Sequence, residues 1–223
     1  MPVTSARLRT VAVLGLASLA LAACGTNLAG AASVVGTETV SDAAIADAVN
    51  EVRAQFDTVQ GQPGVPAFDE AKVTSRNVER MTRHLVLEEA ARAKGIVVTP
   101  AQVDEIIASS VDGRFEGDRS KLELAFATQE FVPPSAVNEF ARDFLISQAL
   151  PARTLPGGAD DAQQKAATDY LVALSDELDV RVAARFGTWD PATTALGPVP
   201  DDLSFVPVPG GSASASPSPS PSS

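Results

Sequence analysis

Histidine and cysteine are almost missing from this chain of 223 residues, which has one of each, His84 and Cys24. A single thiol cannot form a disulfide within the chain, and one histidine with one cysteine cannot supply the usual ligand sets of a protein zinc site. Glycine-rich phosphate-binding loops are also missing, since the glycines are spaced as helix caps and turns. The sequence therefore predicts no catalytic residue, no metal site and no cofactor.

Two interpretations of His84 remain open at this stage. A histidine can serve as an acid–base group near neutral pH, but Glu88 stands one helical turn further along and favours a structural pairing on the same helix. Adjacent carboxylates such as Glu88 and Glu89, or Asp201 and Asp202, would point in different directions on a helix. We interpret these pairs as solvated surface rather than as an acid–base pair.

Basic residues are also few, with 17 Lys and Arg against 28 Asp and Glu, and the formal charge is −11. A chain this acidic repels phosphate backbones, so nucleic acid is not an expected partner. Anionic lipid head groups should repel it for the same reason. Any attachment to a membrane must then come from something other than surface charge.

The first 23 residues lack acidic side chains, and the first acidic residue in the chain is Glu38. Arg7 and Arg9 stand ahead of an apolar run over residues 11–23. This run is shorter than the roughly 20 residues that a helix needs to cross a bilayer. A basic start, a short apolar stretch and small residues at its end are typical of a secretory signal. A buried core helix is the alternative, but it would not explain the residues that follow.

The run ends in Leu-Ala-Ala-Cys-Gly at residues 21–25, which resembles the lipobox of bacterial lipoproteins. The resemblance implies cleavage between Ala23 and Cys24 and a diacylglyceryl group on the Cys24 thiol. Two acyl chains hold a protein stably on a membrane, whereas one chain is marginal. We expect a chain anchored to the cell membrane by lipid, on its extracytoplasmic face.

Composition divides the chain into four expected parts. Residues 1–23 are the signal peptide, 24–31 a lipid tether, and 32–209 a single helical domain large enough for its own core. Residues 210–223 contain only Gly, Ser, Ala and Pro. Because this stretch has no large apolar side chain to offset the entropy of ordering it, we expect a disordered tail.

The domain is mostly helical by its apolar periodicity. Ser41 is a good N-cap, Gly95 a left-handed C-cap, and Thr99 and Pro100 with Gln102 form the sequence of a capping box. The helices are expected over residues 41–59, 69–94, 99–113, 120–129, 133–150 and 160–178.

Two short segments at opposite ends of the domain do not have this helical pattern. Residues 32–40 and 180–186 read as strands, and in the second Val180, Val182 and Phe186 alternate with more polar positions. A lone strand leaves its backbone groups unpaired. We therefore expect the two segments to pair with each other and to join the two ends of the domain.

Three stretches of the sequence resemble the SurA/PrsA family of extracytoplasmic chaperones. Residues 34–41 (VVGTETVS) are similar to the opening strand, glycine turn and capped helix of that family. Residues 84–107 are similar to its helix, Lys-Gly-Ile turn and Val-Thr-Pro helix start, and residues 179–190 to its closing strand. The resemblance implies a mainly α fold, a helical SurA N-terminal-like domain with a small two-stranded sheet that pairs its two ends.

The same resemblance implies a chaperone without enzymatic activity. Family members with prolyl isomerase activity carry a parvulin domain between the helical module and the closing segment. Here only a short Pro/Gly-rich linker separates Leu150 from Asp160, so a parvulin domain does not fit there.

We expect a membrane-anchored chaperone-like lipoprotein that binds unfolded or apolar segments of exported proteins. A structural or scaffold lipoprotein with one specific protein partner in the cell envelope is the alternative. The candidate client-binding residues are aromatic. For most of the phenylalanines we favour a place in the domain core, whereas Trp189 could equally pack where the closing strand leaves the domain. The candidates are Phe126, Phe131, Phe140, Phe144 and Trp189.

Overall fold

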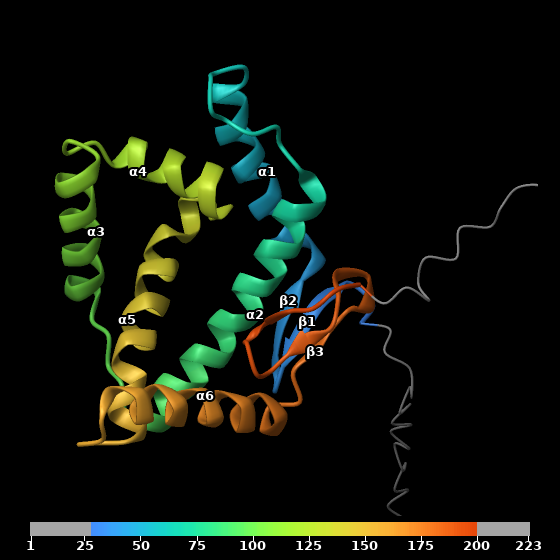
Figure 1. The fold of residues 1–223 in the computed structure, drawn as a ribbon. Coiled ribbons are helices and arrows are strands. Elements are labelled where there is room, and N and C mark those ends of the chain that lie inside the picture. The colour runs from blue at the N-terminus through green and yellow to red at the C-terminus, as the bar shows by residue number, and fades with distance from the viewer. Residues whose placement is uncertain (1–27, 200–223) are drawn as a thin grey trace, which may run out of the picture.

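A computed structural model describes residues 28–199 of the chain (Figure 1). The expected signal peptide, the expected lipid attachment site Cys24 and the expected tail over 210–223 lie outside the described residues. None of the helices within 28–199 combines the length and the apolarity that a membrane span needs.

Six α-helices carry most of the structure, and most of their ends fall within two residues of the expected ones, whereas the fifth helix begins and ends four residues later than expected. Ser41 accepts a hydrogen bond from the Ala44 N–H, and Thr99 and Gln102 form the complete capping box. Gly95 closes the second helix with a φ of 63°. The helices are α1 (Asp42–Val59), α2 (Glu70–Lys94), α3 (Pro100–Arg114), α4 (Arg119–Ala125), α5 (Val137–Thr154) and α6 (Asp160–Glu177).

The fourth helix differs from the expected one in its second half. The sequence predicts one helix over 120–129, but α4 ends at Ala125 and continues as a π-helical turn, η1 (Phe126–Glu130). Phe131 then takes a left-handed conformation with a φ of 58°. A short 3-10 turn, η2 (Pro134–Ala136), leads into α5.

The two ends of the domain pair as expected, but in a sheet of three strands. β1 (Ala31–Val35) and β2 (Glu38–Ser41) form an antiparallel hairpin, because Gly36 turns the chain with a φ of 58°. β3 (Arg181–Val182) pairs with the other edge of β1. The expected single strand over 32–40 is therefore two strands.

The expected strand over 180–186 is shorter than predicted. Only Arg181 and Val182 pair with β1, and Ala184–Phe186 is a 3-10 turn, η3. This turn forms because the Phe186 N–H bonds to the Ala183 carbonyl. A second small sheet follows, in which β4 (Trp189–Asp190) pairs with β5 (Ala195–Leu196).

Helix α2 joins two apolar clusters. One cluster packs α1 and the sheet against the first half of α2, around Val52 and Val78. The other packs the second half of α2 against α3, α5 and α6, around Val86, Ile146 and Leu150. In Figure 1, α2 and α5 run side by side, and α3 flanks α5. Helices α4 and α6 lie across opposite ends of this pair. The mainly α fold class is confirmed.

Candidate functional site

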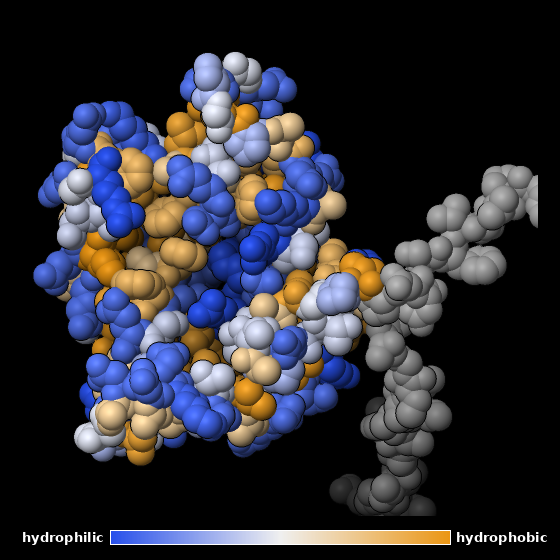
Figure 2. Space-filling model, viewed as in Figure 1, coloured by the Kyte–Doolittle hydropathy of each residue, from blue (hydrophilic) through white to orange (hydrophobic). Residues whose placement is uncertain are grey.

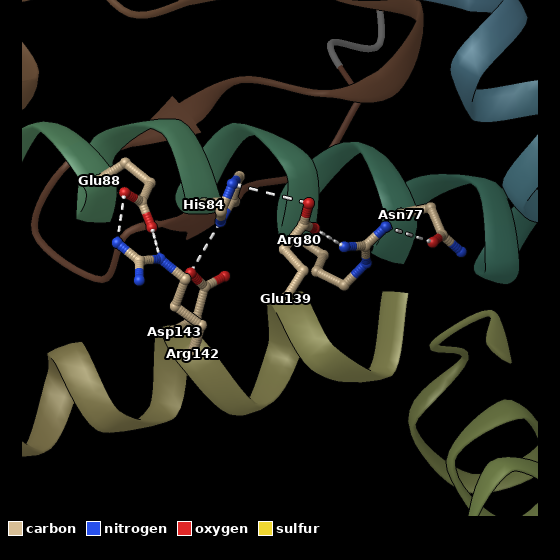
Figure 3. A network of polar contacts seen from close by, with 7 residues as sticks. All are labelled: Asn77, Arg80, His84, Glu88, Glu139, Arg142 and Asp143. Carbon is tan, nitrogen blue, oxygen red and sulfur yellow. Dashed lines mark hydrogen bonds and ion pairs between the residues drawn. The ribbon is translucent and has the colours of Figure 1, made fainter. Parts of the chain in front are cut away.

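A row of charged side chains lies between α2 and α5 (Figure 3). The α2 members stand four residues apart, so they lie on one face of the helix. The α5 members stand on the facing side of α5. We name this row the polar seam: Arg80, His84 and Glu88 from α2, with Glu139, Arg142 and Asp143 from α5.

His84 stands in the middle of the polar seam between two carboxylates of α5. Its Nδ1 lies 2.8 Å from Asp143 Oδ1, and its Nε2 lies 3.6 Å from Glu139 Oε2. Arg80 forms an ion pair with the same Glu139. The seam is therefore continuous from Arg80 to Asp143.

Arg142 closes the other end of the polar seam. Its Nε and Nη2 donate to the two oxygens of Glu88 at 2.5 and 3.0 Å, and its Nη1 donates to the Val98 carbonyl at 2.7 Å. This two-pronged contact lowers the pKa of Glu88 and raises that of Arg142. Arg142 thereby joins α5 both to α2 and to the segment that connects α2 to α3.

Burial and pairing act on His84 in opposite directions. Burial alone would lower its pKa, but the hydrogen bond to Asp143 and the charges of Asp143, Glu139 and Glu88 outweigh it and raise the pKa above 6.5. Burial also raises the pKa of Asp143, in spite of the contact with His84. The raised pKa favours the protonated form of the His84 ring.

The structure corrects the predicted partner of His84. Glu88 does not pair with it, because both Glu88 oxygens face Arg142. The partners are Asp143 and Glu139 on a different helix, which no spacing within α2 could reveal. The matching i, i+4 spacing of Glu139 and Asp143 was the one signal in the sequence.

Three members of the polar seam have the geometry of a possible cation site. One ligand atom each from His84, Glu88 and Asp143 lies within 4.8 Å of the others. Arg142 holds both oxygens of Glu88, and Asp143 contacts His84. With His84 protonated, three carboxylates face three cations, so the seam is already balanced as an ion-pair network that holds two helices together.

The opposite side of α5 faces an apolar depression, which we name the apolar hollow. It has a volume of about 530 Å³ and lies between α3, α4 and α5. Phe126 and Phe140 pack against each other there with ring centroids 5.3 Å apart, and Phe144 is 45% exposed at its edge. Figure 2 shows apolar side chains at the surface over this part of the molecule. The lining also includes Ile106, Ile107, Ser109, Ser110, Gly113, Arg114, Leu122 and Ala141.

A second depression, the charged cleft, lies between α2 and α5 beside the apolar hollow. Phe140 and Phe144 line both depressions and so form a ridge between them. Asp143 of the polar seam also lines the charged cleft, as do Arg76 and Arg83 of α2. The polar seam and the apolar hollow thus share one helix and one ridge.

The five candidate client-binding residues fall into separate places. Phe126, Phe140 and Phe144 meet at the apolar hollow. Phe131 instead stacks on Phe56 at 6.4 Å, in the cluster around α1. Trp189 lies in β4 and packs on the larger apolar cluster. Only three of the five therefore share one surface.

A family model described as SurA-like N-terminal domain matches residues 5–150 of the chain. The match includes α1 to α4 and α5 as far as Leu150, and so the polar seam and the apolar hollow. No curated protein and no solved structure matches the chain.

Proposed function

The chain belongs to the family of SurA-like N-terminal domains, and we propose that it is a membrane-anchored, chaperone-like lipoprotein that binds unfolded or apolar segments of exported proteins. The family is of the chaperone type and extracytoplasmic. The single observation that carries the binding proposal is the apolar hollow with Phe144 at its edge.

The apolar hollow suits a weakly specific ligand. Few large apolar side chains within residues 28–199 are as exposed as Phe144, and it stands beside a depression rather than alone. Burying the exposed 45% of Phe144 contributes about 1 kcal/mol. A client that inserts one or two apolar side chains would bind weakly and reversibly, as a chaperone for many sequences requires.

The connection between α5 and α6 supports a role without isomerase activity. Only residues 155–159 join the two helices. A parvulin domain at this point would need a far longer insertion. We propose that the chain binds clients without isomerising their prolyl bonds, and an assay of cis–trans exchange in a proline-containing peptide should show no acceleration.

Client binding is tested by aggregation of a denatured protein with and without the full chain. We expect suppression by the wild type and a clear loss of suppression by Phe144→Asp, which places a charge in the apolar hollow. Val97→Asp is the matched control, because Val97 is 78% exposed but lies in the segment between α2 and α3. It should suppress aggregation as the wild type does.

Two results would contradict client binding. One is no suppression at excess protein together with no binding of apolar peptides. The other is equal loss of suppression in Phe144→Asp and Val97→Asp, which would mean that the apolar hollow has no special role. Stoichiometric capture of a single native envelope protein instead of many unfolded clients would favour the scaffold lipoprotein.

The membrane anchor is a separate part of the proposal and rests on Cys24, which lies outside the described residues. Replacing Cys24 by Ala removes the thiol that would carry the lipid. We expect the variant to leave the membrane fraction or to keep its first 23 residues. Unchanged membrane retention, or an unmodified thiol in the native protein by mass spectrometry, would contradict the anchor.

A further inference from the structure

We infer that the polar seam is a proton-operated latch, in which the proton on His84 holds α5 against α2 and the loss of that proton loosens the wall shared by the charged cleft and the apolar hollow. The consequence for client affinity rests on the proposed function. The latch itself rests only on the geometry of the two helices.

The first argument is charge balance within the polar seam. Glu88, Glu139 and Asp143 supply three negative charges, and Arg80 and Arg142 supply two positive ones. The third positive charge comes only from protonated His84. Loss of that proton leaves a net negative charge between two packed helices.

The groups around His84 outside the polar seam do not correct this imbalance. Asp47 and Glu51 of α1 line a depression that His84 also lines, and Asp104 of α3 lines another. All three are acidic. Glu51 is already engaged, because it accepts hydrogen bonds from the Ser135 N–H and hydroxyl. The basic residues that line these two depressions, Arg80 and Arg142, already belong to the polar seam.

The second argument is hydrogen-bond geometry. Protonated imidazole has two N–H donors, whereas neutral imidazole has one donor and one acceptor. His84 Nδ1 is hydrogen-bonded to Asp143 at 2.8 Å, and Nε2 lies 3.6 Å from Glu139, which is an ion-pair distance beyond that of a hydrogen bond. Ionised carboxylates only accept. The neutral ring must therefore turn a lone pair toward one of them, and that contact between α2 and α5 becomes repulsive.

The third argument is the position of the latch in α5. Asp143 lines the charged cleft, and Phe144 is the next residue along the same helix. Phe140 lies one turn before Phe144, and both border the apolar hollow. A shift of α5 relative to α2 therefore changes the shape of both depressions together.

The proton on His84 can be followed directly, because His84 is the only histidine in the chain. Its ring Hε1 proton gives a single NMR resonance that needs no assignment by mutation. In the full chain we expect a titration midpoint above 6.5, the value of a free histidine. A midpoint at or below 6.5 would overturn the latch.

Asp143→Asn tests the main contact. The variant removes both the hydrogen-bonded charge and the nearest coulombic partner, so burial should prevail and bring the midpoint below 6.5. Glu139→Gln should lower it by less. Glu89→Gln is the matched control, since Glu89 lies on α2 but pairs with exposed Arg92, and it should leave the midpoint unchanged. An unchanged midpoint in Asp143→Asn would overturn the latch.

Hydrogen exchange tests whether the proton holds the helices. After correction for the intrinsic rate, amides of α5 should lose protection in the wild type as pH rises through the His84 midpoint, while those of α1 keep theirs. His84→Gln, which has no titrating ring, should show low protection of α5 on both sides. Equal protection of α5 across the midpoint in the wild type would contradict the latch.

Client binding is measured separately at one pH below and one pH above the His84 midpoint. If titration and exchange behave as expected but no client binds at either pH, the proposed function fails and the latch stands. If clients bind equally well at both pH values while α5 loosens, the latch exists but does not regulate the apolar hollow. If clients bind and His84 does not titrate above 6.5, the latch fails alone.

Discussion

The two sides of α5 differ in how completely they are paired. Toward α2, the charged side chains of the polar seam have partners on the facing helix. Toward α3 and α4, Phe140 and Phe144 border the apolar hollow, which no part of residues 28–199 fills. One side of the helix is committed to the fold, and the other is left available to a ligand.

This difference means that one side of α5 sets its orientation relative to α2, while the other side can contribute affinity for another molecule. Partly buried ion pairs cost desolvation and add little net stability, but they fix how two helices face each other. Exposed apolar surface costs little to keep and gains free energy when another molecule covers it. Under the proposed function, α5 would combine a fixed orientation with a surface that accepts varied clients.

The comparison between the two sides of α5 assumes that the apolar core, and not the polar seam, supplies most of the stability of α5. Ile146 is a fully buried residue of α5 in the larger apolar cluster. Ile146→Ala should lower the free energy of unfolding by about 2 to 5 kcal/mol, the largest effect expected here, because it leaves a cavity. Denaturant unfolding measures this. A loss smaller than that of Arg142→Met would contradict the comparison.

Arg142→Met tests the polar seam itself. The substitution removes the contacts with Glu88 and the Val98 carbonyl but keeps much of the side-chain volume. Since both charged groups are about one-third exposed, we expect a loss of about 1 to 2 kcal/mol. Arg92→Met is the control, because Arg92 pairs with Glu89 at the surface, and its unfolding midpoint should not change.

The dependence of the unfolding free energy on acidic pH tests whether Glu88 is the partner through which Arg142 stabilises the protein. Arg142 holds the pKa of Glu88 below 4.5, so this pair contributes stability above pH 4.5 that is lost as pH falls through the lowered pKa. The difference in unfolding free energy between wild type and Arg142→Met should therefore shrink as pH falls below 4.5. A difference that stays constant to pH 3 would show that Glu88 is not the relevant partner.

The fold was largely predictable because its signals are local. Ser41, Gly95 and the Thr99 capping box each mark a helix end by their own chemistry, and the structure places the ends there. The π-helical turn after Ala125 has no such signal, since Phe126 to Glu130 read as ordinary helix. The 3-10 turn at Ala184 was hidden in the same way by an alternating pattern.

The site was less predictable because its contacts are long-range. His84 and Asp143 are 59 residues apart in sequence, and only the packing of α5 on α2 brings them together. The aromatic candidates show the same limit. Phe131 looks no different from Phe126 in the sequence, yet the left-handed turn directs it to Phe56 and away from the apolar hollow.

Phe144→Ala is expected to have the smallest effect on stability and the clearest effect on binding. The side chain is 45% exposed, so its removal should change the free energy of unfolding by less than about 1 kcal/mol. It also removes the exposed edge of the apolar hollow, so apolar peptides should bind more weakly. Arg142→Met should do the reverse, with lower stability and nearly unchanged peptide affinity at neutral pH. Because Arg142→Met leaves the contacts of His84 in place, a joint fall of stability and affinity in both variants would show that binding depends on the rigidity of the whole helix pair rather than on an open apolar surface.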